Sequence, residues 1–183
     1  MLIRKAEFKD IQVLEELIPE SVRGLQARDY TSDQVEGALG TIFGVDRQLI
    51  RDGTYFVVEV ESKIVACGGW SRRKTLFGSD DSPEKDDACL DPSKEPARIR
   101  AFFVDPAWAR RGIGSLIVRT CEAAAWAEGF LRLELVATLT GEPLYSAHGF
   151  QGEERFEVPL PNGATLPVVR MTKSIDQGAR SKG

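Results

Sequence analysis

The sequence has little of what zinc proteins, disulfide-rich proteins and membrane proteins require. It contains one histidine, His148, and three cysteines, Cys67, Cys89 and Cys121, without metal-ligand spacing. We therefore expect no metal site and no disulfide framework. No apolar run approaches the roughly 18 residues that span a membrane. The N-terminus enters strand-like sequence directly rather than through a signal peptide. We expect a cytoplasmic protein with free thiols and no membrane partner.

The chain also lacks a basic segment. Its formal net charge is −4, and residues 79–95 hold seven acidic and only two basic residues. Nucleic-acid binding needs a clustered positive face, so we expect no nucleic-acid partner and disfavour a DNA-binding regulator. The acidic run lies in an expected loop insertion over residues 73–96. It is either a solvated face or a device that attracts cationic substrates.

The remaining pattern favours one mixed domain. With 183 residues, 42% of them hydrophobic, the chain can fill one substantial core. Periodicity and turn residues predict strands over residues 2–7, 54–60, 63–70, 98–104, 131–137, 150–158 and 164–173. They predict helices after Asp10, from Thr31 toward Leu49, and over 112–128 and 141–148. We expect an α+β fold with three layers over residues 1–173 and a disordered tail over 174–183.

The most informative segment couples the strand at 98–104 to a glycine loop and a long helix. Gly112 and Gly114 lack a β-carbon, so the backbone can turn tightly and bring its N–H groups close to an anion. The helix that follows offers unpaired amides and the positive end of its dipole. Arg110 and Arg111 add positive charge at the same place. The segment therefore predicts a cradle for a pyrophosphate.

Two common phosphate-binding motifs fit this loop poorly. A nucleotide P-loop needs Gly-Lys-Ser/Thr, which occurs nowhere in the chain. A dinucleotide fingerprint would need a small third residue at position 117, which is Ile117, and would lie in a first βαβ unit. The pyrophosphate cradle must therefore be of another kind.

The segment resembles the GNAT acyltransferase superfamily, with a strand ending in Val-x-Pro, an aromatic residue, an Arg-rich turn, Gly-x-Gly and an amphipathic helix. A second stretch, Tyr145 followed by three residues and then Gly149 and Phe150, resembles the family's tyrosine motif. The resemblance implies a mixed, mostly antiparallel sheet with a central splayed strand pair and flanking helices. It also implies an N-acetyltransferase that uses acetyl-CoA as co-substrate and a primary amine as acceptor, by direct attack in a ternary complex.

The resemblance also implies site residues. Tyr145 would lie beside the coenzyme sulfur and protonate the leaving thiolate, as the catalytic acid. The pyrophosphate loop would comprise Ala109, Arg110, Arg111, Gly112, Ile113, Gly114 and Ser115. Phe103 and Val104 would hold the pantetheine arm and acyl carbonyl through main-chain atoms, with the N–H of Val104 meeting the oxyanion. The chain departs from the family where Ala109 replaces a Gln or Arg, and where Thr138 or Thr140 replaces an Asn.

The general base and the acceptor stay open. Arg98 and Arg100 stand where some relatives place a glutamate, and are either exposed charges or partners of an acceptor carboxylate. The amine would lose its proton to water or to a carboxylate such as Glu142. The acceptor would be a small amine or a peptide, and the closing strands from 150 to 173 could pair across a homodimer. A non-catalytic acyl-CoA-binding sensor or scaffold is the alternative function.

Overall fold

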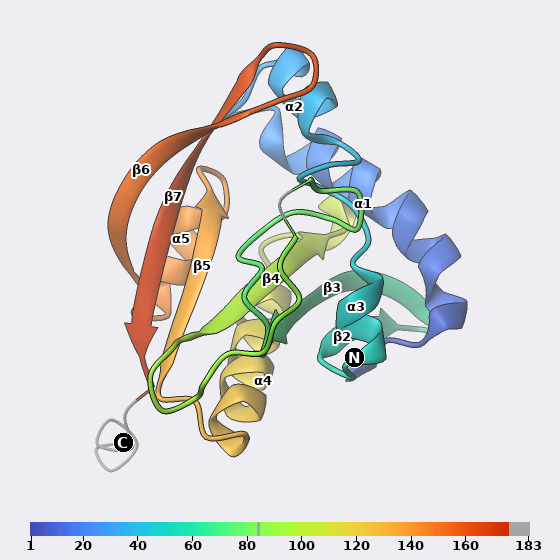
Figure 1. Ribbon diagram of the computed structural model, residues 1–183. Coiled ribbons are helices and arrows are strands. Elements are labelled where there is room, and N and C mark those ends of the chain that lie inside the picture. Colours follow the sequence, from blue (N-terminus) through green and yellow to red (C-terminus); the bar gives the residue numbers. More distant parts are fainter. Residues whose placement is uncertain (84, 176–183) are drawn as a thin grey trace.

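The computed structural model describes residues 1–83 and 85–175, and it is built on one seven-stranded sheet (Figure 1). The strands are β1 (Leu2–Lys5), β2 (Tyr55–Val60), β3 (Lys63–Ser71), β4 (Ala97–Val104), β5 (Arg132–Thr138), β6 (Gln151–Pro159) and β7 (Thr165–Ser174). Their order in the sheet is β1-β2-β3-β4-β5-β7-β6. Only the β4–β5 pair is parallel, so the expected mixed, mostly antiparallel sheet is confirmed.

Helices cover both faces of this sheet. They are α1 (Ile11–Gln26), α2 (Ser32–Ala38), α3 (Arg47–Arg51), α4 (Ile113–Ala127) and α5 (Glu142–Ala147), with short 3-10 turns η1 (Phe8–Asp10) and η2 (Pro106–Trp108). The strand β5 shows the division, because Leu133 and Leu135 join the core under α4 whereas Val136 packs against the core under α1. We name the two sides the α1 face, covered by α1 to α3, and the α4 face, covered by α4 and α5.

The strands β4 and β5 separate soon after they meet. Their registered pairs are only Ala97 with Leu133 and Arg98 with Glu134. On its other edge, β4 shifts register against β3, which leaves Ala101 and Phe102 without partners, and Ala101 has a left-handed φ of 58°. A non-glycine residue in this region marks a bulge rather than regular strand. The splayed strand pair expected from the resemblance is present, and β4 carries a bulge beside it.

Two expectations for the N-terminal half need correction. The helix from Thr31 keeps its capping box with Gln34, but it ends at Ala38 rather than continuing toward Leu49. The chain turns through Gly40, whose φ is +92°, before α3 begins. Asp10 precedes α1 without capping it. Its carboxylate accepts from the backbone N–H of Glu7 instead, at 2.8 Å.

The loop between β3 and β4 is tied to the rest of the structure. It crosses in front of β4 in Figure 1. Backbone hydrogen bonds join its two arms, from Lys74 N–H to the Ala88 carbonyl at 2.9 Å and from Leu90 N–H to the Arg72 carbonyl at 2.8 Å. Leu90 is buried. Leu90 packs in the core of the α4 face, whereas the Asp80 N–H donates to the Val45 carbonyl at 3.2 Å on the side of α1 to α3, so the acidic run is folded against both sides.

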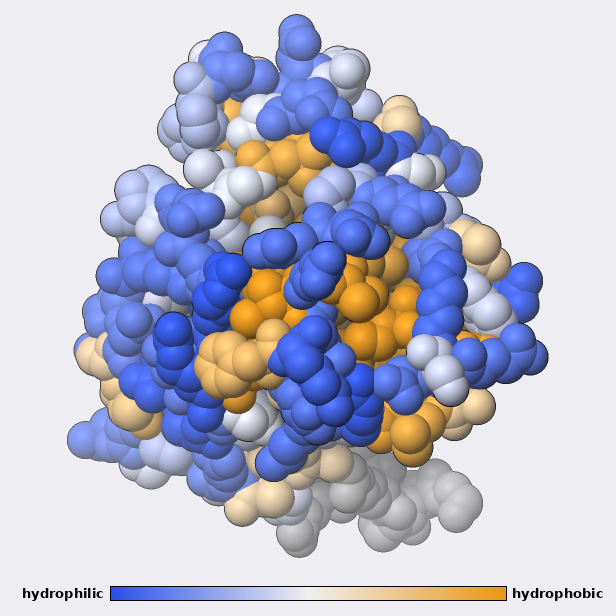
Figure 2. Space-filling view, turned by 90° about the vertical axis from the view of Figure 1, so that its right-hand side faces the viewer, coloured by the Kyte–Doolittle hydropathy of each residue, from blue (hydrophilic) through white to orange (hydrophobic). Residues whose placement is uncertain are grey.

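The remaining expectations concern the chain end and the surface. Residue 174 ends β7, so the expected tail starts too early, and residues 176–183 lie outside the described residues. Within the described part of the chain, no helix is long and apolar enough to cross a membrane. Figure 2 shows apolar side chains gathered at the centre of one side of the molecule, within a hydrophilic rim. The apolar surface there is a contained patch.

Candidate active site

The glycine loop opens α4 with its first amides unoccupied. Gly112 is the N-cap residue in a left-handed conformation, with φ 80° and ψ 6°. The first helical bond runs from Leu116 N–H to the Gly112 carbonyl, at 3.0 Å. Among the described residues none accepts from the amides of 113–115. A β-carbon at Gly112 would meet nothing within 4 Å. An anion can therefore approach these amides from open space.

The two arginines of the loop differ in their surroundings. Arg110 has a left-handed φ of 63°, which is uncommon for a residue with a β-carbon and is found at functional sites. The guanidinium of Arg111 stacks on the Trp108 ring at 4.7 Å. Ala109 ends η2, and its N–H is directed at the Pro106 carbonyl at 3.4 Å. The amide of Ala109 is thus partly engaged within η2, unlike the amides of 113–115.

Tyr145 lies on α5 and points into the α4 face. Its ring makes edge contacts with Phe102 of the β4 bulge and with Phe150, each with centroids 5.8 Å apart. Burial raises the pKa of Tyr145 above its ordinary value, so the phenol stays protonated at neutral pH. Its hydroxyl has no hydrogen-bond partner in the described part of the chain, yet it is not among the fully buried unpaired atoms. A protonated donor therefore stands beside the bulge.

Two contacts lock α5 to the start of α4. A β-carbon at Gly114 would lie 2.9 Å from Cδ2 of Leu144, so the helices approach more closely than a larger residue allows. The Ser115 hydroxyl lies 2.8 Å from Nε2 of His148, the residue that ends α5. Burial lowers the pKa of His148, which keeps its ring neutral at pH 7. The hydroxyl expected at the pyrophosphate is thus engaged with His148.

The N–H of Val104 is not free, which corrects the expected oxyanion contact. It donates to the hydroxyl of Ser21 on α1, at 3.1 Å. Ser21 is buried, and a β-carbon at Gly24, one turn further on, would lie 2.4 Å from Pro106. The close packing of α1 on η2 therefore brings the serine to the end of β4. A serine inside a helix gives no sequence signal for such a contact.

The end of β5 is also occupied by local bonds. The Thr138 hydroxyl accepts from Gly141 N–H at 3.0 Å, and the Thr140 hydroxyl donates to Asp29 at 2.8 Å. Glu142, considered as a proton acceptor, pairs with Arg155 at 2.7 Å. The carboxylate that the sequence suggested as a proton acceptor, that of Glu142, is therefore already in an ion pair.

Arg98 and Arg100 are neither exposed nor available to an acceptor. Arg98 pairs with Glu134 of the neighbouring strand. Arg100 is 6% exposed and lies 2.9 Å from the carboxylate of Asp46, which is fully buried and caps α3. Arg100 also donates to the Gly78 carbonyl of the β3–β4 loop. Both sequence interpretations of Arg100 were wrong, because a partner 54 positions away buries it.

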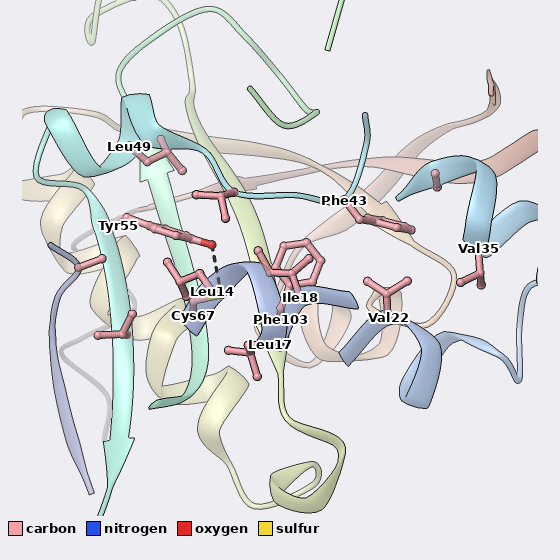
Figure 3. Close-up of a cluster of buried hydrophobic side chains, with 14 of the residues drawn as sticks. Leu14, Leu17, Ile18, Val22, Val35, Phe43, Leu49, Tyr55, Cys67 and Phe103 are labelled. Carbon is pink, nitrogen blue, oxygen red and sulfur yellow. Dashed lines mark hydrogen bonds between the residues drawn. The ribbon is translucent and has the colours of Figure 1, made fainter. Parts of the chain in front are cut away.

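The cysteine nearest the bulge is inert. Figure 3 shows Tyr55 and Cys67 on neighbouring strands, with the tyrosine hydroxyl in hydrogen-bond contact with the Cys67 sulfur at 3.1 Å. Burial raises the pKa of Cys67 to about 12, so it stays a thiol rather than a nucleophilic thiolate. Within residues 1–83 and 85–175, no group of three His, Cys, Asp or Glu side chains could hold a metal ion.

Comparison with known proteins matches the middle of the chain to a protein family. The family profile described as "Acetyltransferase (GNAT) domain" matches residues 51–152, which include β2 to β5, the glycine loop and Tyr145. No curated protein shows significant sequence similarity to the chain. The matched residues make up more than half of the chain.

Solved structures of low sequence identity share the fold. A GCN5-related N-acetyltransferase from Rhodopseudomonas palustris has a TM-score of 0.70 and 20% identity, and the match covers 95% of each chain. The PaiA N-acetyltransferase of Thermoplasma acidophilum, solved with coenzyme A, has a TM-score of 0.63 and 15% identity, covering 94% of this chain and 98% of that one. A ribosomal-protein-alanine N-acetyltransferase from Brucella melitensis has a TM-score of 0.64 and 16% identity, covering 96% and 100%.

Proposed function

The chain belongs to the GNAT acetyltransferase family and is an acyltransferase, and from this premise we propose that it moves an acetyl group from acetyl-CoA to a primary amine by direct attack in a ternary complex. The observation that carries the proposal is the early separation of β4 and β5. The opening is flanked by the bulge of β4 and by Tyr145, which contacts Phe102 there.

Acetyl-CoA would bind across the α4 face. Its pyrophosphate lies on the amides of Ile113, Gly114 and Ser115, with the side chains of Arg110 and Arg111 adding charge. Its pantetheine arm runs along the free edge of β4 against main-chain atoms of Phe103 and Val104, and reaches Thr138 at the end of β5. Support comes from the unoccupied amides at the start of α4 and from the short β4–β5 pairing.

The oxyanion donor would come from the bulge rather than from Val104. The bulge residues Ala101 and Phe102 have no partner in β3, and the Ala101 carbonyl is taken by the Tyr55 hydroxyl at 3.1 Å. We assign the oxyanion contact to the N–H of Phe102. Loss of one such donor typically costs about 3 to 4 kcal/mol of transition-state stabilisation.

Tyr145 would supply the proton for the departing thiolate. It is protonated at neutral pH because of its burial, and its hydroxyl keeps its donor unused. The amine would lose its proton to water, because Glu142, Glu134 and Asp46 are already paired with arginines. The buried Cys67 thiol favours direct attack over an acyl-cysteine intermediate.

The test is calorimetric titration with acetyl-CoA, followed by thiol release against a panel of amines. In Gly112→Asp/Gly114→Asp, the new carboxylate at 112 would stand in the open space before the pyrophosphate, and the side chain at 114 would press on Leu144 and move α5 away from the loop. Like charges in contact cost several kcal/mol. We expect affinity for acetyl-CoA to fall by about 10³-fold. The control is Gly163→Asp, which has the same left-handed φ and open space but lies in the β6–β7 turn. Unchanged affinity in the double variant, or no thiol release with any amine, would contradict the proposal.

The domain organisation, the compartment and the oligomeric state of the protein stay predictions. The chain is proposed to form a single domain over residues 1–173 in the cytoplasm. The closing strands from 150 to 173 remain candidates for a homodimer contact, although the outer strand β6 carries Glu153, Glu154 and Glu157, and charges on an edge strand oppose edge-to-edge pairing.

A further inference from the structure

We infer that the acceptor amine also carries a carboxylate and that Arg170 on β7 binds this carboxylate. The inference rests on the proposed acetyl transfer and names its substrate class. It arises from a row of charged side chains that crosses the α1 face, next to the point where β4 and β5 separate. The row comprises Arg98 on β4, Glu134 on β5, Arg170 on β7 and Glu154 on β6.

The register of the sheet places Arg170 beside the opening. Arg170 pairs across the strands with Val136, and Val136 lies two residues beyond the last registered pair of β4 and β5, Arg98 with Glu134. The next residue of β7 on this face, Val168, is opposite Thr138 at the end of β5. Neighbouring strands are about 4.8 Å apart. Arg170 therefore stands one strand away from the opening, on the face opposite Tyr145.

Arg170 has donors to spare, and its side chain is 33% exposed. Its one hydrogen bond within the described residues runs from Nη1 to Glu134, at 3.2 Å. Its Nε lies 3.7 Å from Glu154, too far for a hydrogen bond, and the Glu154 side chain is 62% exposed. Arg98 shares the same glutamate in a shorter contact, with only 14% of its side chain exposed, and Arg100 is buried.

The charge of the inner group is incomplete. Two guanidinium groups, those of Arg98 and Arg170, face the single carboxylate of Glu134, which is 13% exposed. An arginine has five donors in a planar fork that matches a carboxylate with two parallel bonds. A substrate carboxylate can therefore take the place that Glu154 only partly fills, and balance the second guanidinium of the inner group.

Apolar side chains beside Arg170 suit the body of such an acceptor. Phe77 of the β3–β4 loop and Phe156 of β6 have ring centroids 6.3 Å apart, and both are partly exposed against the core of the α1 face. Val136 and Leu139 belong to the same partly buried set. The combination favours an amino acid or related amine with an apolar body rather than a polyamine.

The experiment is calorimetry on the protein saturated with coenzyme A. This complex can bind acceptors, but it has no acetyl group to transfer, so no turnover occurs. The probes are two matched pairs, L-phenylalanine with its amide and aminohexanoate with hexylamine. A hydrogen-bonded charge contributes about 1.5 to 3 kcal/mol, so we expect each carboxylate to bind about 10- to 100-fold more tightly than its partner. Equal binding within both pairs, tighter binding of the partners that lack the carboxylate, or no binding of any probe overturns the inference.

Variants separate recognition from folding. Arg170→Gln should abolish the preference for carboxylates, while Arg170→Lys should keep part of it, because the charge remains but the fork is lost. Glu154→Gln should tighten carboxylate binding by up to about fivefold, since an exposed ion pair is worth about 0.2 to 1 kcal/mol. The melting temperature and the affinity for coenzyme A should stay unchanged in all three, because Arg98 still pairs with Glu134. A preference that survives Arg170→Gln overturns the inference.

Acetyl transfer itself is scored separately. Thiol release from acetyl-CoA with hexylamine at high concentration tests the proposed function without any carboxylate. If hexylamine and its acid partner both react but with equal KM, acetyl transfer stands and the role of Arg170 fails. If coenzyme A does not bind at all, the proposed function fails first.

Discussion

The two faces of the sheet are assembled from different kinds of contact. On the α4 face, the residues proposed for the pyrophosphate and for the catalytic acid come from two short stretches, the glycine loop at 110–115 and the tyrosine stretch at 145–150. On the α1 face, the decisive contacts join distant residues, as Ser21 joins Val104 and Asp46 joins Arg100. Turn chemistry and helix starts define the first face, whereas pairing across the fold defines the second.

This difference separates coenzyme chemistry from acceptor choice. The α4 face presents backbone amides and a buried tyrosine, which suit a cofactor that is the same for every substrate. The α1 face presents paired charges and partly exposed aromatic rings, such as Phe77 and Phe156. Side chains are easily changed while the backbone is kept, so specificity is expected to reside on the α1 face.

The strongest test of the difference between the two faces replaces one tyrosine on each face by phenylalanine. Tyr145→Phe should lower kcat by about 10²- to 10⁴-fold, the usual contribution of a general acid. Its thermal stability should hardly change, because the hydroxyl has no described partner. Steady-state kinetics and thermal unfolding measure both effects.

Tyr30→Phe is the matched control. The Tyr30 hydroxyl donates to the Pro167 carbonyl at 2.6 Å and accepts from Leu139 N–H at 2.9 Å, and burial raises its pKa to about 12. Its loss leaves buried backbone groups unpaired, so stability should fall by about 1 to 3 kcal/mol. A large loss of kcat in Tyr30→Phe with none in Tyr145→Phe would reverse the assignment of the two faces.

A second test removes the buried cation of the α1 face. Arg100→Met leaves the buried carboxylate of Asp46 without its nearer cation, since Lys85 lies 3.7 Å away and Arg100 2.9 Å. Removing one partner of a buried ion pair typically costs about 3 to 5 kcal/mol. Urea unfolding monitored by circular dichroism measures this loss. The double variant Arg100→Met/Asp46→Asn should recover much of it, because asparagine is uncharged and still caps α3. Equal stability of the single and double variants would show that the stabilisation does not come from the ion pair between Arg100 and Asp46.

A third test asks whether the N–H of Val104 donates to Ser21 on the α1 face or to the bound coenzyme. Ser21→Ala removes its acceptor, and an unsatisfied buried donor costs about 1 to 3 kcal/mol of stability. We expect the affinity for acetyl-CoA to stay the same, because the bond joins α1 to β4 within the α1 face. Tighter coenzyme binding in the variant would mean that Val104 donates to the coenzyme and that Ser21 competes with it.

The smallest expected effect is on the pH profile. Burial raises the pKa of Tyr145, and a general acid with a raised pKa remains protonated further into the alkaline range. We therefore expect kcat to show no alkaline decline up to about pH 10, the ordinary pKa of tyrosine. A decline beginning near neutrality would assign the proton to another group.

The sequence predicted most of the fold, including the glycine loop that opens α4. The helix over 112–128 and the hairpin through Glu61 and Ser62 follow local rules, and both stand within a residue or two of their expected bounds. The helix after Thr31 was overextended because its apolar stripe continues past Gly40, where the backbone turns. The role of Ser21 gave no pattern at all, because a single hydroxyl in a helix looks the same whether or not it meets a strand.

By itself, the sequence determined the family, the glycine loop and the tyrosine beside it, because the chemistry of a tight turn and a helix start lies within a few neighbouring residues. Only the tertiary structure decided which charged groups remain available. Arg98, Arg100 and Glu142 carry the same charge in any conformation. The fold pairs each of them with a distant partner and leaves Arg170 with unused donors, because a charge is neutralised by what lies near it in space and not along the chain.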